Sequence, residues 1–364
     1  MDNKATKQLL DKYFFQLHDA AQWILRSERK DGGSSAQFVP FLGWSKAYPE
    51  TTGYTIPTLI DIGNRLNSPI YLDLSVRFGD WLLSIQNADG SWNRGKHPST
   101  NTKPSIFNTG QILLGLVSLW DQTHEEKWIQ SATMGANWLM QRQISNGLWD
   151  GGDYKSSITP SYYSHVLWPM LEVSSRINDS FLSSSAAKGI YEIVSRRQEN
   201  GVISGWSFRE GDYAYTHTIA YTIRGLQEAS RLLDDYKIAQ CIDDSLDLLI
   251  RRSELSRGAL PGCFNEQWHH NSGFVCLTGS LQVAHCILIR ESSRPDLREV
   301  SAAARMIDFV CSKQSKYVPF LSTHGGIAGS APFWGPYLRC RFPNWAAKYF
   351  IDAIIALTDR FSVA

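Results

Sequence analysis

An apolar side chain followed five residues later by a glutamine, and then by a glycine turn, recurs along the whole chain. The clearest copy has Gln86 five residues after Trp81, with Gly90 and Trp92 behind it. Degraded copies follow the same spacing, and the six anchors are Trp23, Trp81, Trp138, Ile193, Leu248 and Phe309. Successive anchors are 55 to 61 residues apart, which is enough for two helices and their loops. Stacked units of this kind share a core that no single unit can bury alone.

A second helix is expected after each anchor, because apolar residues recur there with a period near 3.6. The expected ranges are 54–66, 109–120, 161–177, 217–233, 278–290 and 344–360. These helices are more continuously apolar than the first ones, and a helix that is apolar on all sides is enclosed. We therefore expect an inner ring inside an outer ring of Trp/Gln helices. The predicted fold is all-α, an (α/α)6 toroid of about six helical hairpins, with residues 1–364 forming a single domain.

The stretch from Trp81 to Trp92 resembles the QW motif of squalene-cyclase-type repeats. The chain as a whole resembles the α/α toroids of terpenoid cyclases, protein prenyltransferases and six-hairpin glycan-active enzymes. It is also similar to an uncharacterised bacterial family with prenyltransferase-like repeats, found in surface-polysaccharide gene clusters. The stretches that carry this second likeness are 48–54, 107–111, 216–221, 276–279 and 343–347. The resemblance implies the toroid fold, but toroids host unrelated chemistries.

Terpenoid chemistry is the less favoured implication of that resemblance. The acidic DxDD tetrad of class II cyclases has no counterpart here, and Asp234-Asp235 and Asp243-Asp244 are plain doublets. Prenyltransferases hold zinc with an Asp, a Cys and a His. Phe274 stands two residues before Cys276, where that pattern requires an aspartate. The adjacent His269 and His270 lack spaced partner ligands, so we predict no metal and no cofactor.

Composition and charge narrow the class of partner and the compartment. Lys+Arg 36 against Asp+Glu 35 gives a net charge of +1 without a basic stripe, which argues against nucleic acid. The first twelve residues lack the apolar core of a signal peptide, and no run is long enough to span a membrane. The six cysteines form no CxxC pair, which is typical of free thiols in a reducing compartment. We therefore expect a cytoplasmic protein.

Unusual polar residues gather where the inner helices are expected to begin. They include Glu50 and Tyr54, Asn108 and Gln111, Tyr163, His217, Tyr221 and Arg224, Gln282, and Asn344. Inner helices of an α/α barrel all run the same way, so these clusters should meet at one end. Converging helix N-termini favour an anion there. Helix capping is the alternative explanation for the asparagines and for Thr51, Thr109 and Thr278, which lie in the same clusters. A place in the core is the alternative for the tyrosines.

The loops that lead to these helices are long and aromatic, and we expect them to wall a cleft over the mouth. Four tryptophans in or beside them are candidate platforms for sugar rings: Trp92, Trp149, Trp206 and Trp268.

The leading functional hypothesis is a lyase or C5-epimerase acting on a uronate-containing polysaccharide or oligosaccharide. Such an enzyme removes the proton next to a carboxylate, so it needs a cation or amide for the carboxylate and an acid–base pair. Asn108, Gln111 and Arg224 are candidates for the first role. His217 and Tyr221, four residues apart on one helix face, are candidates for the second, with Tyr54 or Tyr163 opposite.

Two alternatives remain open at this point. A six-hairpin glycoside hydrolase needs two carboxyl groups, and its candidates are Glu50, Asp150, Asp153 and Glu266. A non-catalytic glycan-binding toroid, working with other proteins of polysaccharide assembly, would bind sugar without turnover.

Overall fold

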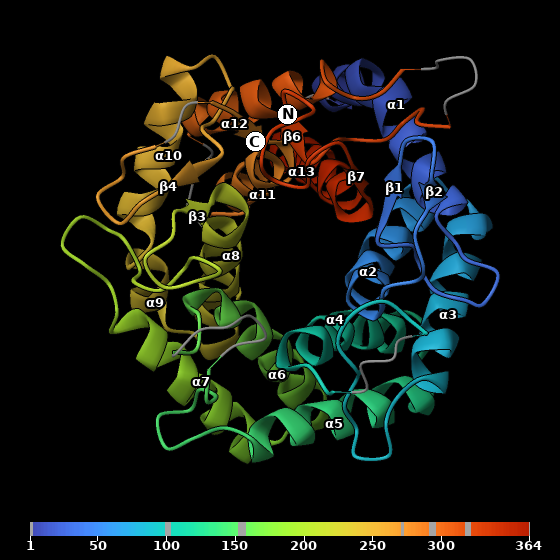
Figure 1. Ribbon diagram of the computed structural model, residues 1–364, viewed down its shortest axis with the longest axis vertical. Helices are drawn as coiled ribbons and strands as arrows, with labels where there is room; N and C mark the ends of the chain where they lie inside the picture. The colour runs from blue at the N-terminus through green and yellow to red at the C-terminus, as the bar shows by residue number, and fades with distance from the viewer. Residues whose placement is uncertain are drawn as a thin grey trace.

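The computed structural model describes residues 3–98, 103–151, 158–270, 273–290, 296–316 and 322–363. Its helices form two concentric rings around a central axis (Figure 1). The inner ring consists of α2 (Pro49–Arg65), α4 (Ile106–Thr123), α6 (Ser164–Ile177), α8 (Thr216–Leu233), α11 (Leu277–Leu288) and α13 (Asn344–Val363). The outer ring consists of α1 (Asn3–Arg26), α3 (Pro69–Ser84), α5 (Glu126–Gln141), α7 (Ser180–Val194), α10 (Asp243–Leu255) and α12 (Leu297–Cys311). The short α9 (Tyr236–Gln240) precedes α10, and a 3-10 turn, η1 (Ser161–Tyr163), precedes α6. The predicted (α/α)6 toroid is confirmed.

The ring closes on itself. Each inner helix packs against the next, and α13 completes the circle by contacting α2. The N-terminal helix α1 packs on the C-terminal helix α13, so the two ends of the chain form one of the six hairpins. The degraded repeat at Leu248 lies in α10, which contacts α11 and α12 as part of the outer ring. The loss of the motif there does not open the toroid.

Glycines let the inner helices approach one another closely. A Cβ atom on Gly53 of α2 would lie 2.6 Å from Cα of Ile112 in α4. A Cβ atom on Gly225 of α8 would lie 2.4 Å from the carbonyl carbon of Ser164 in α6. One on Gly279 of α11 would lie 2.5 Å from the backbone nitrogen of His217. Real Cβ atoms do not pack at such distances, so these backbone contacts require glycine and keep the inner ring narrow.

In three of the repeats, at Gln86, Gln143 and Gln314, the repeated glutamine clamps the end of one outer helix to its neighbour. Nε2 of Gln86, just past the end of α3, donates to the carbonyl oxygens of Gly90 (2.9 Å) and of Ser131 in α5 (3.0 Å). Its Oε1 accepts from Oγ of Ser131 at 2.7 Å. Gln143 repeats this pattern with the backbone of Gly147 and with Ser185 of α7. One amide therefore satisfies both the glycine turn and the next outer helix, which accounts for the fixed offset from the anchor.

Short antiparallel strand pairs join the loops at the end of the toroid where the inner helices begin. The order β2-β1-β7 links β1 (Gln37–Val39) to β2 (Gly43–Trp44) and to β7 (Phe342–Pro343), so that Phe38 pairs with both Trp44 and Phe342. Two further pairs join β3 (Ala214–Tyr215) to β4 (Cys263–Phe264) and β5 (Val275–Cys276) to β6 (Ser330–Ala331). Strands β3, β5 and β7 run directly into α8, α11 and α13. They fix where those helices start, and so where their first-turn side chains lie.

Candidate active site

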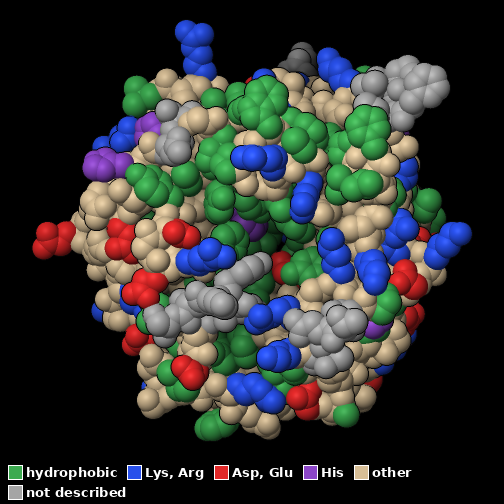
Figure 2. All heavy atoms as spheres, viewed as in Figure 1, with side chains coloured by type: hydrophobic (Ala, Val, Ile, Leu, Met, Phe, Trp, Pro, Cys, Tyr) green, Lys and Arg blue, Asp and Glu red, His purple; other side chains and the backbone are tan. Residues whose placement is uncertain are grey.

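A cavity of about 480 Å³ occupies the mouth of the toroid at the N-terminal ends of the inner helices. Its walls are largely aromatic, and its lining includes Tyr48, Glu50, Arg94, Phe107, Asn108, Tyr162, Phe208, Tyr215, His217, Tyr221, Tyr337 and Trp345. Figure 2 shows this face hollowed near its centre, with Lys and Arg side chains standing around the hollow. The helix starts therefore bring together side chains that lie up to 297 residues apart in the sequence, from Tyr48 to Trp345. We call this cavity the front cavity.

His217, in the first turn of α8, is held by an amide from the neighbouring helix. Nδ1 of its ring lies 2.8 Å from Oε1 of Gln282 in α11. An amide oxygen only accepts hydrogen bonds, so Nδ1 carries the proton and Nε2 keeps its lone pair. Burial lowers the pKa of His217 to about 4. The ring is therefore neutral at physiological pH and can accept a proton at Nε2.

Tyr221 lies between two histidine rings. Its ring centroid is 4.4 Å from that of His217, one turn earlier on α8, and 4.4 Å from that of His165 on α6. Burial raises the pKa of Tyr221 well above its usual value, so its hydroxyl keeps its proton. A neutral imidazole beside a protonated phenol is an arrangement of base and acid.

His165 is fixed in the same tautomer as His217. Nε2 of Gln111 in α4 donates to the carbonyl oxygen of His165 at 2.7 Å, which turns Oε1 of the same amide toward the His165 ring, 2.9 Å from Nδ1. Nδ1 is again the protonated nitrogen. Burial lowers the pKa of His165, and the charges of Arg224 and Lys348 lower it further. Gln111 was predicted to bind substrate, but it is fully buried and committed to His165.

Basic groups rim the cavity and few acids reach it. Arg94 lines it directly. Partial burial lowers the pKa of Lys96, and the charge of Arg341 lowers it further, which places these two cations close together. Glu50 is the one carboxylate among the described residues that line the cavity. Nδ2 of Asn108 donates to the backbone oxygen of Asn93 at 3.1 Å and leaves the Asn108 side chain at the wall.

The four tryptophans predicted to stack on sugars are core residues. Trp92, Trp149, Trp206 and Trp268 are between 0 and 4% exposed, and none lines the front cavity. Nε1 of Trp92 donates to the carbonyl oxygen of Leu82 at 2.8 Å, and Nε1 of Trp149 repeats this with Leu139 at 3.0 Å. These two indoles thus fold back under the helix before them, while Nε1 of Trp268 donates to the backbone oxygen of Asn200 at 3.0 Å. None of the four tryptophans is a platform at the front cavity, so their predicted placement at the cleft is wrong. The aromatic wall comes instead from tyrosines and phenylalanines.

Three other predicted residues of the mouth lie in the interior or at the far end. Asn344 is fully buried and donates to Oγ of Ser27 at 2.9 Å, tying the start of α13 to the end of α1. Tyr163 is fully buried against Phe107 and Trp149 and does not line the cavity. Arg224 lines a different cavity, at the opposite end of the inner ring.

Tyr54 also faces that second cavity, with its hydroxyl 3.2 Å from Oγ1 of Thr51. Tyr54 and Arg224 are therefore misplaced by the sequence prediction, while His217, Tyr221, Asn108 and Glu50 meet at the front as predicted.

The other predicted carboxylates do not meet Glu50 across the cavity. Oε2 of Glu266 accepts from Nε2 of Gln198 at 2.9 Å, and its backbone oxygen accepts from Asn200 at 2.8 Å, so Glu266 braces a loop. Asp150 is exposed and does not line the cavity. Asp153 lies outside the described residues. The carboxyl pair expected for hydrolysis is not formed by the described residues at the mouth.

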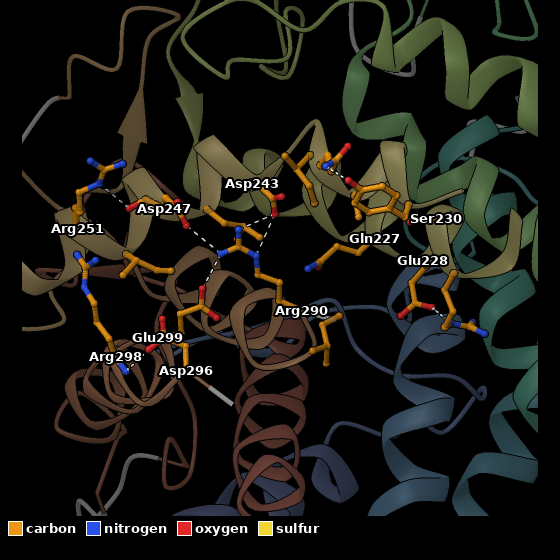
Figure 3. Close-up of a pocket in the computed structure, with 18 residues that line it drawn as sticks. Gln227, Glu228, Ser230, Asp243, Asp247, Arg251, Arg290, Asp296, Arg298 and Glu299 are labelled. Carbon is orange, nitrogen blue, oxygen red and sulfur yellow. Dashed lines mark hydrogen bonds and ion pairs between the residues drawn. The ribbon is translucent and has the colours of Figure 1, made fainter. Parts of the chain in front are cut away.

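A further hollow of the described surface is an ion-pair groove. It holds about 880 Å³ between α8–α10 and α11–α12, and Figure 3 shows the Arg290 side chain pointing at three carboxylates within it. The Arg290 guanidinium lies 2.7 Å from Asp243, 2.9 Å from Asp247 and 2.7 Å from Glu299. The charged groups around Arg290 therefore pair with one another. The groove lacks the acid–base pair of the front cavity.

The described residues contain no group of three or more His, Cys, Asp or Glu side chains placed to hold a metal ion. Within the same residues, no helix is long and apolar enough to cross a membrane.

Arg94, Gln282 and Tyr337 belong to the site. The sequence prediction named neither Arg94 nor Tyr337, and it placed Gln282 only among the polar residues that gather where the inner helices begin. Tyr337 lies 5.3 Å from His217, ring centroid to centroid, and its hydroxyl accepts from Nε1 of Trp345 at 3.1 Å. Arg94 and Tyr337 come from loops, where no periodicity marks a residue as facing the mouth. Gln282 lies one turn into α11, at the same depth as Tyr221 in α8. This equal distance from the helix start was the sequence signal that Gln282 could lie at the level of the site.

Solved structures of other proteins share this architecture. No family model matches the chain, and no curated protein matches it. Solved structures do match over nearly their whole length. An unsaturated glucuronyl hydrolase specific for heparin has a TM-score of 0.72 at 14% identity, covering 99% of each chain. The cellobiose 2-epimerase of Bacillus thermoamylovorans has a TM-score of 0.74 at 13% identity, covering 95% of this chain and 99% of the other.

An alpha-amylase from Clostridium perfringens has a TM-score of 0.63 at 12% identity, covering 94% of this chain and 97% of the other. At these identities the likeness establishes the fold alone. The chain has the six-hairpin α/α toroid fold seen in these carbohydrate-active enzymes.

Proposed function

We propose that the protein is a lyase or C5-epimerase that acts on a uronate-containing polysaccharide or oligosaccharide in the front cavity. The observation that carries the proposal is the pair formed by neutral His217 and protonated Tyr221 at the floor of a cavity rimmed by cations. The toroids with matching folds include an unsaturated glucuronyl hydrolase and a cellobiose 2-epimerase, whose substrates are sugars.

The cavity supplies what binding of an acidic sugar requires. Arg94 would pair with the uronate carboxylate, in place of the Arg224 and Gln111 that the sequence suggested. Asn108 adds an amide beside it, and Tyr215 and Tyr337 offer ring faces for stacking. Neutralising the carboxylate makes the neighbouring C5–H more acidic, because the charge that develops on removal of the proton spreads onto that group.

The two reactions share a first step. Nε2 of His217 takes the C5 proton, and the electron pair of the C–H bond moves toward the carboxyl group. In the lyase, this pair then forms the C4–C5 double bond, the C4–O bond breaks, and Tyr221 donates its proton to the departing oxygen. In the epimerase, a water molecule returns a proton to C5 from the opposite face, because His217 and Tyr221 lie side by side on one helix. The lyase cycle ends when the imidazolium passes its proton back to the phenolate, and the epimerase cycle ends when the imidazolium passes its proton to the hydroxide left by that water.

Hydrolysis is the second candidate, and Glu50 is the observation that favours it. A glycosidase needs two carboxyl groups on either side of the scissile bond, and Glu50 alone among the described residues lining the cavity supplies one. The proposed setting is the one the sequence predicts, namely the synthesis or processing of a polysaccharide in the cytoplasm together with other assembly proteins.

The test is incubation with a panel of uronate-containing and neutral oligosaccharides, with products identified by mass and NMR. We expect unsaturated or C5-inverted products from uronate substrates only, and their loss in His217→Gln and Tyr221→Phe. The control is Tyr213→Phe, which removes the hydroxyl of an exposed tyrosine just before α8 and should leave turnover unchanged. Saturated products carrying an added water would establish the hydrolase instead, and binding without any product would establish a non-catalytic toroid.

A further inference from the structure

The opposite end of the inner ring contains a second cavity that the proposed reaction does not use. It holds about 510 Å³, a volume typical of small-molecule sites, and all six inner helices contribute to its walls. We call it the rear chamber. Tyr221 lines the front cavity while His165, Tyr54 and Tyr349 line the rear chamber, so a layer of aromatic rings separates the two.

Polar groups in the rear chamber lack partners within the protein. Nη1 of Arg224 is buried without a hydrogen-bond partner, although Nη2 of the same guanidinium lies 2.8 Å from Oε1 of Glu228. The hydroxyl of Tyr349, a residue only 5% exposed, lies near the side chains of Tyr221 and Gln282 but forms no hydrogen bond of normal geometry with either. Burying such groups unpaired is unfavourable. A bound ligand that supplies the missing acceptors would remove that cost.

The deep wall of the rear chamber is cationic. The guanidinium of Arg224 stacks 5.2 Å over the ring of Trp168, which holds it in place. Nζ of Lys348 lies 4.3 Å over the Tyr349 ring and is bonded to Asp352. Burial lowers the pKa of His285, and the charges of Arg224 and Lys348 lower it further, so all three face the same space. A neutral His285 offers either a donor or an acceptor to a hydroxyl group.

The outer part of the rear chamber carries acids that are paired with arginines. Asp61 and Asp359 each lie 2.8 Å from Arg65, and Asp121 lies 2.8 Å from Arg176. The inner helices end there, so the negative ends of their dipoles make entry of a multiply charged anion such as phosphate less favourable than entry of a single carboxylate. A single carboxylate can reach the free Arg224 nitrogen, and hydroxyls on the same molecule can meet Tyr349 and His285.

We propose that the rear chamber is a second binding site, separate from the front cavity, for a small hydroxylated monocarboxylate held by Arg224, Tyr349 and His285. Arg224 anchors the carboxylate through Nη1, and Trp168 keeps the guanidinium aimed at it. This site does not depend on the reaction proposed for the front cavity.

The experiment is histidine NMR on the full chain labelled with ¹³C at the ring Cε1 positions. The probe is sodium glucuronate, compared with glucose and with inorganic phosphate. The signals of His285 and His217 report on the rear chamber and the front cavity, and are assigned with His285→Gln and His217→Gln. We expect glucuronate to shift the His285 signal saturably. Glucose should bind at least about tenfold more weakly, the loss expected without one charge-assisted hydrogen bond. Phosphate should also bind more weakly, because it lacks the sugar hydroxyls that meet Tyr349 and His285.

Two variants and a matched control separate the two sites. Arg224→Gln should raise the Kd reported by His285 at least about tenfold, and Arg224→Lys keeps the charge should the first variant fold poorly. Lysine lacks the planar fork, so it should also weaken binding. The control is Arg231→Gln, an exposed arginine of the same helix that pairs with the same Glu228, and it should bind as the wild type does.

A His285 signal that does not move, or that moves equally in Arg224→Gln, would overturn the proposal. Movement of His217 alone with glucuronate would place binding at the front only, which ends the rear site and leaves the proposed function standing. Movement of the His285 signal in a protein that turns over no uronate substrate would support the rear site and end the proposed function.

Discussion

Oε1 of Gln282 in α11 lies 2.8 Å from Nδ1 of His217 in α8, and this contact fixes which nitrogen of the histidine faces the front cavity. Gln282 does not line that cavity, so it is a positioning residue. Its oxygen stabilises the imidazolium, and it therefore partly offsets the burial that lowers the pKa of His217.

Replacing Gln282 with glutamate should move the acid limb of the pH–rate profile. A base must be unprotonated to act, so the wild-type kcat/KM should fall only as the pH drops toward about 4, the pKa of His217. A carboxylate at position 282 favours the charged imidazole and should move that limb to higher pH. The measurement is kcat/KM against pH for both proteins. An unmoved limb would show that His217 is not the group that titrates.

Stability should also depend on pH through His217. Its pKa is about 4 in the folded protein and near 6.5 in the unfolded chain, so the unfolded chain binds the proton more tightly. Stability is therefore independent of this group above pH 6.5 and falls as the pH drops from 6.5 to 4, by about 3 kcal/mol in all. Denaturant unfolding across this range should show a flatter pH dependence in His217→Gln. Exposed His18→Gln is the control and should keep the wild-type slope.

Gln86→Ala should destabilise the toroid without touching the site. The substitution removes the amide that bonds Gly90 and Ser131 and leaves their groups unsatisfied, at a cost of about 1–3 kcal/mol. Gln130→Ala, an exposed glutamine on the neighbouring helix α5, should change the unfolding free energy by less than about 0.5 kcal/mol. Equal effects in urea unfolding would mean that the clamp contributes nothing.

Glu50→Gln distinguishes proton abstraction from hydrolysis. Loss of a general acid lowers kcat by about 10²–10⁴-fold, and the hydrolase mechanism assigns Glu50 such a role. In the mechanism proposed here, Glu50 only supplies charge at the start of α2, so kcat should fall by less than about tenfold. Steady-state rates on the best uronate substrate decide between these outcomes.

The fold was predictable because the repeat has one physical cause. The amide of Gln86 meets the turn at Gly90 and the neighbouring outer helix together, so the spacing survives where other residues have drifted. The continuously apolar second helices likewise follow from enclosure, and they form the inner ring. The finer resemblance to a QW-repeat family stays a prediction, since no family model matches.

The candidate site was predictable only for part of its depth. His217, Tyr221 and Arg224 share one face of α8, but seven residues of helix span about 10 Å. Arg224 therefore lies below the Tyr221 layer, in the rear chamber. The sequence pattern shows which face of a helix a residue lies on. It does not show how far along the toroid axis the layer of aromatic rings divides the front cavity from the rear chamber. The prediction that the tryptophans line the cleft was wrong for a different reason. A tryptophan just after a helix can pack beneath that helix, as Trp92 and Trp149 do, as easily as it can face a cleft.

Removal of the C5 proton tests the central claim most directly. A uronate oligosaccharide carrying deuterium at C5 is incubated with the enzyme, and the label remaining on the sugar is followed by mass spectrometry. We predict loss of the label with the wild type, whether the product is unsaturated or epimerised, and loss at least about 100-fold slower with His217→Gln. Products that keep all their deuterium would contradict the account, since no proton would then have left C5.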